Sequence, residues 1–171
     1  MTDSQVKQTL TELLQQREYE ITEEDEETMM AINAAGEKIC AFLETVPKFN
    51  VKEFLTYVGR LNALEIDHGI IVYDSITSAA KKLLTNTTEL KTTLELFEVS
   101  TLRYNLTFHR LVPPHIKVGT EEAKTLKDKY GAGNFPILKS TDAAARFYGF
   151  KKGDVIKIIR ATGFVAYRIV R

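Results

Sequence analysis

The stretch from Thr141 to Arg160 constrains the fold of this chain more than any other part of the sequence. Thr141 or Asp142 is expected to cap a short helix, because either side chain can accept hydrogen bonds from free N–H groups of the first turn. The helix is predicted over Ala143–Tyr148 and should end at Gly149, where a left-handed residue commonly terminates a helix. The stretch therefore begins with a short helix that stops sharply.

A β-hairpin is predicted directly after this helix. Gly153 can adopt a positive φ in the intervening turn at no steric cost. The segment 155–160 is rich in β-branched residues, and a second strand, 164–171, follows a tight connection. Because side chains alternate along a strand, Lys157 and Arg160 are expected on opposite faces of the hairpin.

Length and composition limit the class of protein. A chain of 171 residues is long enough for one domain or two small ones, and 44% hydrophobic residues permit a core. The sequence has no apolar run as long as a membrane span and does not start like a signal peptide. Cys40 is the single cysteine, so no intramolecular disulfide can form. We expect a buried, inert thiol and a reducing, intracellular compartment.

The net charge of zero conceals a split between two parts of the chain. Residues 1–106 hold 10 Lys and Arg against 18 Asp and Glu, a balance of −8. Residues 107–171 hold 13 against 5, a balance of +8. Such an asymmetry indicates two surfaces with different partners.

Residues 1–106 are predicted to form an α/β domain, a mixed sheet with helices packed on it. An acidic run at 23–27 is interpreted as a solvated loop or helix end. Asn50 and Glu53 are expected to form a capping box, and Phe54, Leu55, Val58 and Leu61 an apolar stripe. The predicted elements are a helix over 4–18, a hairpin of 28–32 and 38–43, a helix over 51–63, a strand over 66–73, a helix over 75–84, and strands over 94–98 and 102–109.

Residues 107–171 are predicted to form a small α+β domain that ends in the β-hairpin. The boundary is placed near Val112–Pro114, because two adjacent prolines impose an extended, stiff connection. A helix over 120–130 and a short strand over 135–138 should precede the closing stretch. A domain of about 65 residues buries a modest fraction of its surface, so it should be marginally stable unless it docks on a partner.

Metal and catalytic sites receive little support from the sequence. His109 and His115 are six residues apart without a cysteine or carboxylate partner, whereas structural zinc takes four ligands. Asp74, Glu89 and Lys91 are the best enzymatic alternative, a Mg²⁺-dependent nuclease. That site requires Glu89 and Lys91 on a strand beside Asp74, yet a loop-like segment precedes them. No catalytic residue and no cofactor is predicted.

The basic residues of the closing stretch allow three interpretations. They could neutralise DNA phosphates, meet an acidic protein surface, or simply keep the domain solvated. A Lys-Lys-Gly-Asp turn that leads into a basic hairpin also resembles DNA-binding modules of the transition-state-regulator type. The set comprises Arg146, Lys151, Lys152, Lys157, Arg160, Arg168 and Arg171.

The closing stretch also resembles a known family, the common subunit 5 of DNA-dependent RNA polymerases, which has an archaeal counterpart. Further upstream, the residues similar to the part of the family that precedes its signature are Leu106, Thr107, His109, Leu111–Pro113, His115 and Phe135–Ile137. The residues that resemble the signature are Asp142, Ala145–Gly149, Lys151–Gly153, Val155–Arg160, Tyr167 and Arg168.

This resemblance implies a non-catalytic subunit of a multisubunit RNA polymerase. Its C-terminal domain, 107–171, would dock on the largest subunit, and its N-terminal domain, 1–106, would form part of the lower jaw near downstream duplex DNA. The residues implied in docking are His109, Leu111, Val112, Pro113, His115, Arg146, Tyr148, Gly149, Lys151, Lys152, Gly153, Lys157, Arg160, Tyr167 and Arg168.

The resemblance also bears on the source of the chain. Archaeal members resemble only the part after about residue 106, so an N-terminal domain implies a eukaryotic type of enzyme. The expected location is the nucleus, or a viral factory or virion if a large DNA virus encodes the chain.

Overall fold

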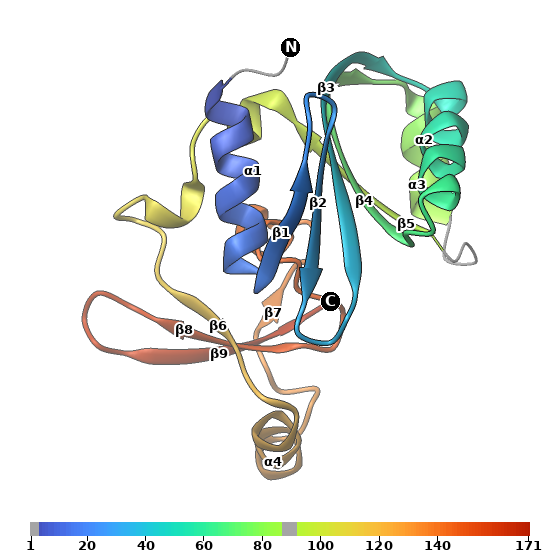
Figure 1. Cartoon of the computed structure of the whole chain (residues 1–171). Coiled ribbons are helices and arrows are strands. Elements are labelled where there is room, and N and C mark those ends of the chain that lie inside the picture. The colour runs from blue at the N-terminus through green and yellow to red at the C-terminus, as the bar shows by residue number, and fades with distance from the viewer. Residues whose placement is uncertain (1–3, 87–91) are drawn as a thin grey trace. The chain divides into compact units, whose positions relative to one another are not determined.

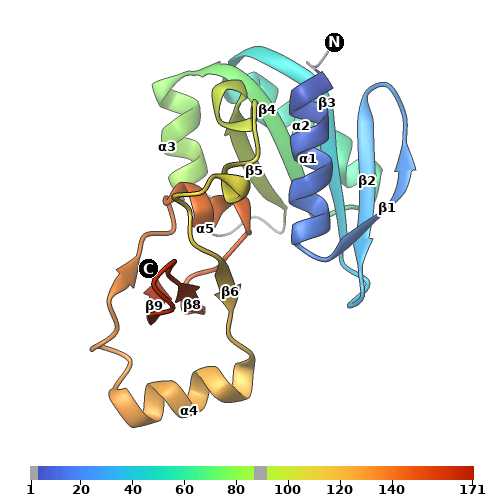
Figure 2. The same cartoon turned by 90° about the vertical axis from the view of Figure 1, so that its left-hand side faces the viewer.

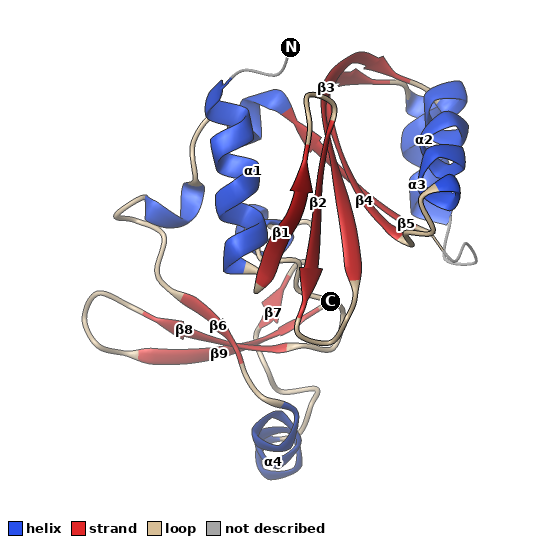
Figure 3. Cartoon of the chain, viewed as in Figure 1, coloured by secondary structure: helices blue, strands red, loops and turns tan. Residues whose placement is uncertain are grey.

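A computed structural model describes residues 4–86 and 92–171 of the chain. The chain divides into two compact units, Met1–Tyr104 and Asn105–Arg171. Each contains one mixed β-sheet with helices (Figure 3), so the predicted fold class is confirmed. No helix within residues 4–86 or 92–171 is long and apolar enough to cross a membrane.

The first unit is built on a five-stranded sheet of order β1-β2-β3-β4-β5. Strands β1, β2 and β3 pair antiparallel, whereas β3, β4 and β5 pair parallel. Helix α1 lies on one face of the sheet, and α2 and α3 lie on the other (Figure 1). The described elements are α1 (Ser4–Gln16), β1 (Tyr19–Glu24), β2 (Thr28–Asn33), β3 (Lys38–Phe49), α2 (Val51–Ala63), β4 (His68–Ile76), α3 (Ser78–Asn86), β5 (Thr93–Glu98) and the 3-10 helix η1 (Val99–Leu102).

The central strands of this sheet are covered on both faces. Residues 39–43 of β3 are all buried, and so are Ile70, Ile71 and Val72 of β4; such an unbroken apolar run is typical of a strand covered on both faces. Cys40 is fully buried in β3, and this burial raises the pKa of its thiol to about 11. The prediction that this thiol is buried is therefore confirmed.

Helix α2 begins and ends at the predicted residues. The Asn50 side chain accepts hydrogen bonds from the N–H groups of Lys52 and Glu53, at 2.8 and 3.1 Å. The predicted apolar stripe is wrong at one position, because Leu55 is 62% exposed and Tyr57 is buried in its place. The Tyr57 hydroxyl donates to the Glu44 carboxylate at 2.8 Å, which lets the ring pack inside while its polar end stays satisfied.

Strand β1 was not predicted, and it includes Glu23 and Glu24 of the acidic run that we expected in a loop. It is an edge strand whose residues are mostly exposed, so the sequence shows no alternation of apolar and polar side chains. The turn after it is held by Asp25, whose carboxylate accepts from the N–H groups of Glu27 and Thr28 at 2.7 and 2.6 Å.

The strand predicted over 102–109 is also wrong. The chain instead forms the 3-10 helices η1 and η2 (Leu106–Phe108). The Asn105 side chain accepts from both the N–H and the hydroxyl group of Thr107, at 2.9 and 2.6 Å. Such local side-chain bonds compete with strand pairing, which hydrophobicity alone does not reveal.

An ion-pair cluster joins the end of α1 to the sheet. Arg17 donates to both carboxylate oxygens of Glu95 at 2.8 Å, and His68 Nε2 donates to the same carboxylate at 2.6 Å. The side chain of Arg17 is only 5% exposed. Burial alone would raise the pKa of Glu95, but the hydrogen bonds from His68 and Arg17 outweigh it and lower the pKa to about 2. The cluster therefore ties three elements together by a charged network.

We expect Glu95→Gln to lower the free energy of unfolding by about 3 kcal/mol at pH 7, because it removes the negative charge that balances the buried Arg17. The folded-state pKa of Glu95 lies below its ordinary value of 4.5, so this contribution is present above that pH and is lost as the pH falls toward about 2. Denaturant titrations across this range should show the difference from wild type shrinking. The matched control is Glu98→Gln, an exposed change on the same strand, and should stay within about 0.5 kcal/mol of wild type. A constant difference for Glu95→Gln at every pH would contradict this account.

The second unit is built on a four-stranded sheet of order β6-β8-β9-β7. Helix α5 and helix α4 lie on opposite sides of this sheet (Figure 2). The predicted helix, the positive φ of Gly149 and Gly153, and the antiparallel hairpin are all present. The elements are η2 (Leu106–Phe108), β6 (His115–Lys117), α4 (Thr120–Tyr130), β7 (Ile137–Leu138), α5 (Ala143–Phe147), β8 (Val155–Ile159) and β9 (Val165–Val170).

Two small cores fill the two faces of this sheet. On the face of α4, Val155 and Ile169 pack with Val118, Ala123 and Phe135. On the face of α5 the buried set is Leu138, Ala145, Ile156, Ile158 and Val170. Neighbouring residues of β8 and β9 thus belong to different cores, as strand alternation requires.

Deletion of residues 169–171 should abolish cooperative melting of the second unit. Ile169 and Val170 are 7% and 1% exposed, and each buried side chain stabilises the unit by about 1.5–3 kcal/mol. The deletion also removes the bond from Gly153 N–H to the Val170 carbonyl, 2.9 Å long. Scanning calorimetry of the full chain and of the deletion would measure the loss. Removal of Arg171 alone keeps both core residues and should cost far less; an unchanged melt after the larger deletion would contradict the two-core arrangement.

Candidate docking surface

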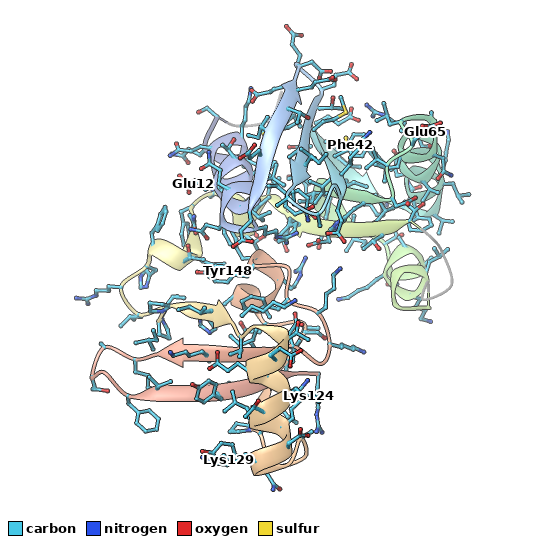
Figure 4. All side chains as sticks on the ribbon, turned by 60° about the horizontal axis from the view of Figure 1, so that its bottom comes forward. Glu12, Phe42, Glu65, Lys124, Lys129 and Tyr148 are labelled. Atoms are coloured by element: carbon cyan, nitrogen blue, oxygen red, sulfur yellow. The ribbon has the colours of Figure 1, made fainter. Side chains whose placement is uncertain are left out.

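An aromatic cluster forms around Tyr148, just after helix α5. The Asp142 side chain caps this helix by accepting from Ala144 N–H at 2.9 Å. The Tyr148 ring stacks on Phe150 with centroids 5.2 Å apart and lies 6.3 Å from the His115 ring. Figure 4 labels Tyr148 within the second unit. Burial raises the pKa of the Tyr148 hydroxyl, although a hydrogen bond with the Thr107 side chain acts in the opposite direction.

One member of this cluster, His115, also bonds to the segment that contains the adjacent prolines. The Nδ1–H group of His115 donates to the carbonyl of Pro113 at 2.7 Å. His109 is exposed, and its Nδ1 accepts from Leu111 N–H at 3.3 Å. The structure therefore brings together His115, Pro113 and Tyr148 from the predicted docking set, and leaves His109 and Leu111 at the surface.

Hydrogen bonds to its backbone groups fix the conformation of the Lys151–Gly153 turn. The Asp154 carboxylate accepts from Lys151 N–H at 2.8 Å and pairs with Lys117 Nζ at 3.0 Å. Gly153 has φ of 91°, a conformation that other residues rarely adopt, and its carbonyl accepts from Lys127 Nζ at 2.8 Å. The side chains of Lys151 and Lys152 are exposed, so the turn presents two solvated cations on a rigid backbone.

The cations of the hairpin do not form one patch. Lys157 lies directly across from Tyr167, whereas Ile156 lies across from Arg168. Residues that face each other across a ladder share a face and neighbouring residues do not, so Lys157 and Arg168 point to opposite sides. The Arg168 guanidinium donates to the carbonyl of Ile137 at 3.3 Å. Arg160, exposed beyond the end of β8, is tied to the tip of the hairpin by its N–H bond to the Phe164 carbonyl, 2.9 Å long.

A group of exposed apolar side chains in the second unit was not predicted from the sequence. Phe108, Ile116, Phe164 and Val165 are 71%, 48%, 64% and 38% exposed, in addition to the expected Leu111 at 75%. Val165 alternates with the partly buried Tyr167 and the buried Ile169, so the pattern alone predicts a covered strand. The structure shows that α4 packs over the Val155 and Ile169 end of the sheet, whereas Val165 stays exposed.

The enzymatic alternative gains no support from the geometry. Asp74 lies exposed near the end of β4, whereas Glu89 and Lys91 fall outside the described residues. Within residues 4–86 and 92–171 no group of three or more His, Cys, Asp or Glu side chains is arranged to hold a metal ion.

Comparisons with known proteins identify the family of the chain. The family model described as "RNA polymerase Rpb5, C-terminal domain" matches residues 104–170, which nearly coincide with the second unit. The "DNA-directed RNA polymerases I, II, and III subunit rpabc1" of Dictyostelium discoideum is 32% identical over 96% of this chain and 95% of its own length. The chain belongs to the Rpb5 family of RNA polymerase subunits. The resemblance found in the sequence is therefore confirmed.

The family also has viral members. The "Putative DNA-directed RNA polymerase subunit 454R" of Invertebrate iridescent virus 6 is 31% identical over 94% of this chain and 95% of its own length. Both relatives match the acidic first unit as well as the second, so the similarity extends across the whole Rpb5-type chain.

One solved structure resembles the chain only weakly. It is the "ATP-dependent Type ISP restriction-modification enzyme LlaBIII bound to DNA", with a TM-score of 0.39 and 16% identity over 77% of this chain and 10% of that one. A similarity at this level supports no conclusion about fold or activity.

Proposed function

We propose that this chain is a non-catalytic subunit of a multisubunit DNA-dependent RNA polymerase. Its second unit docks on the largest subunit, and its first unit forms part of the lower jaw near downstream duplex DNA. The observation that carries this proposal is the match to polymerase subunits over 96% and 94% of the chain. Such a subunit acts in the nucleus, or in a viral factory or virion if a virus encodes it.

The features of the second unit support docking. It is a small unit with a charge of +8 from 13 basic and 5 acidic residues after position 106. It carries exposed apolar side chains such as Phe108 and Leu111, which are 71% and 75% exposed. A basic surface with exposed apolar groups fits an acidic protein partner, because burial of these groups contributes to binding and the charge steers association.

The charge of the first unit fits a position beside DNA without tight binding to it. Its charge of −8 repels phosphates at close range. Its sheet is tied to the end of α1 by the ion pair of Arg17 and Glu95. An acidic unit suits a surface that limits the path of duplex DNA without binding it.

A free-standing DNA-binding module is the second candidate. The exposed Lys151 and Lys152 and the hairpin cations favour it, since such groups neutralise phosphates. The division of hairpin cations between two faces of the sheet argues against it, because one duplex would contact only one of these faces. Salt-dependent binding of the purified chain to random-sequence duplex would support this rival.

Reversal of both turn lysines, Lys151→Glu with Lys152→Glu, should weaken binding to the polymerase largest subunit by about tenfold or more. Two solvated cations are replaced by anions that repel an acidic partner. The fold should be kept within about 0.5 kcal/mol for each exposed position. Binding can be measured by calorimetry or pull-down with the separately purified largest subunit from the same source.

The matched control reverses Lys124 and Lys129 on α4, which Figure 4 labels and which lie outside the predicted docking set. It changes the net charge by the same amount and should leave binding nearly unchanged. Equal losses for both pairs would show a non-specific charge effect. Failure of the unmodified chain to bind the largest subunit would contradict the proposed function itself.

A further inference from the structure

The sheet of the second unit has two edges that differ in a way that bears on docking. In the order β6-β8-β9-β7, β6 and β7 are the outer strands among the described residues. An outer strand presents backbone N–H and C=O groups that can pair with another chain unless something occupies them. The two edges differ in whether these groups are occupied.

The β7 edge is short and is partly capped by a side chain of the chain itself. The N–H groups of Ile169 and Arg171 donate to the carbonyls of Pro136 and Leu138, both at 3.0 Å. Backbone groups alternate along a strand, so those of Ile137 point away from β9. Its carbonyl accepts from the Arg168 guanidinium at 3.3 Å, which places a bulky side chain over this edge.

The β6 edge has no such cover. The N–H of Ile159 donates to the Pro114 carbonyl at 3.2 Å, and Val118 N–H donates to the Val155 carbonyl at 2.9 Å. In this antiparallel ladder the backbone groups of residues 114, 116 and 118 therefore face β8. Those of His115 and Lys117 point outward, and no strand of the described chain lies beyond them.

The sheet face beside this edge is apolar and uncovered. Ile116, Lys157 and Tyr167 lie opposite one another across three strands, and Ile159 lies opposite Val165. Helix α4 covers the Val155 and Ile169 end of the same face. Ile116 and Val165 remain 48% and 38% exposed, so a side chain on an added strand would find apolar partners there.

The surroundings of the edge are cationic. Residues 109–118 and 155–164 contain Arg110, Lys117, Lys157 and Arg160, and neither segment contains a carboxylate. The adjacent Asp154 is already engaged by Lys117 Nζ at 3.0 Å and Lys151 N–H at 2.8 Å. An incoming strand with carboxylates would therefore meet complementary charge, whereas a basic one would be repelled.

We propose that β6 binds an extended, acidic segment of the polymerase largest subunit as an additional strand of this sheet. The inference rests on the proposed function and specifies the surface and the chemistry of the segment. Backbone groups of His115 and Lys117 pair with the segment, its apolar side chains contact Ile116, and its carboxylates approach Lys157. Strand addition of this kind takes affinity from the main chain and specificity from alternate side chains.

Two other occupants fit the edge less well. A second copy paired through β6 would bring two units of charge +8 together and place Lys117 beside the cations of its mate. Duplex DNA could pair with the cations. It would leave the outward N–H groups without the carbonyls of a paired strand, and Ile116 without an apolar partner.

The test uses the full chain and the purified largest subunit from the same source. Residue-resolved hydrogen exchange should show that the His115 and Lys117 amides exchange quickly in the free chain and about tenfold or more slowly in the complex. Lys117→Pro, which removes one outward N–H group, should weaken binding about tenfold, a loss equivalent to one unmade hydrogen bond at a buried interface. Lys117→Ala keeps the N–H group and should lose clearly less.

The matched control is Ile137→Pro, which removes an outward N–H group at the partly capped β7 edge and should bind like the wild type. Melting curves check that each variant folds. If Lys117→Pro does not fold, hydrogen exchange of the wild-type complex alone decides whether the strand addition occurs. Binding without protection of these amides would overturn the strand addition and leave the proposed function intact. Absence of wild-type binding would overturn both, and self-association or DNA binding that protects the same amides would overturn the choice of occupant.

Discussion

The pairing of β8 with β9 is the interaction on which the second unit depends. Val155 lies opposite Ile169, and Ile156 lies opposite Arg168, so adjacent ladder positions supply both cores. The same two strands carry β6 at one side and β7 at the other. The open strand β6 pairs with β8 at one side of this ladder. The Lys151–Gly153 turn leads into β8. A small unit of this kind gains most of its stability from two thin cores, and the order of its strands decides which surfaces stay open.

The sequence predicted best where local chemistry determines the structure. The Asn50 cap, the Asp142 cap and the positive φ of Gly149 and Gly153 depend on side chains or backbone freedom within a few residues. Central strands such as β4 were also predictable, because burial on both faces demands an unbroken apolar run. Two of the four edge strands of the described sheets, β1 and β6, were not predicted. β1 is largely exposed and β6 is three residues long after two prolines, so neither has a hydrophobic period that could identify it.

The candidate docking surface was predictable in kind but not in arrangement. Its basic character follows from composition, and the contact between His115 and Tyr148 joins two segments that the family resemblance had already selected. The exposure of Ile116 and Val165 could not be predicted, because it depends on where α4 ends relative to the sheet. The capping of β7 by Arg168 is likewise a tertiary contact, since it links residues that are 31 apart in the sequence. The openness of β6 is therefore a property of the folded unit and not of any motif.

The central claim is that this Rpb5-type chain works as a part of a polymerase and not alone. The most direct measurement is to isolate the chain under native conditions from its source, through an affinity tag, and to determine the composition and stoichiometry of what accompanies it. The account predicts two very large subunits in equal amounts with the chain, in a complex that synthesises RNA on a DNA template. Recovery of the chain alone, or on DNA without these subunits, would contradict it.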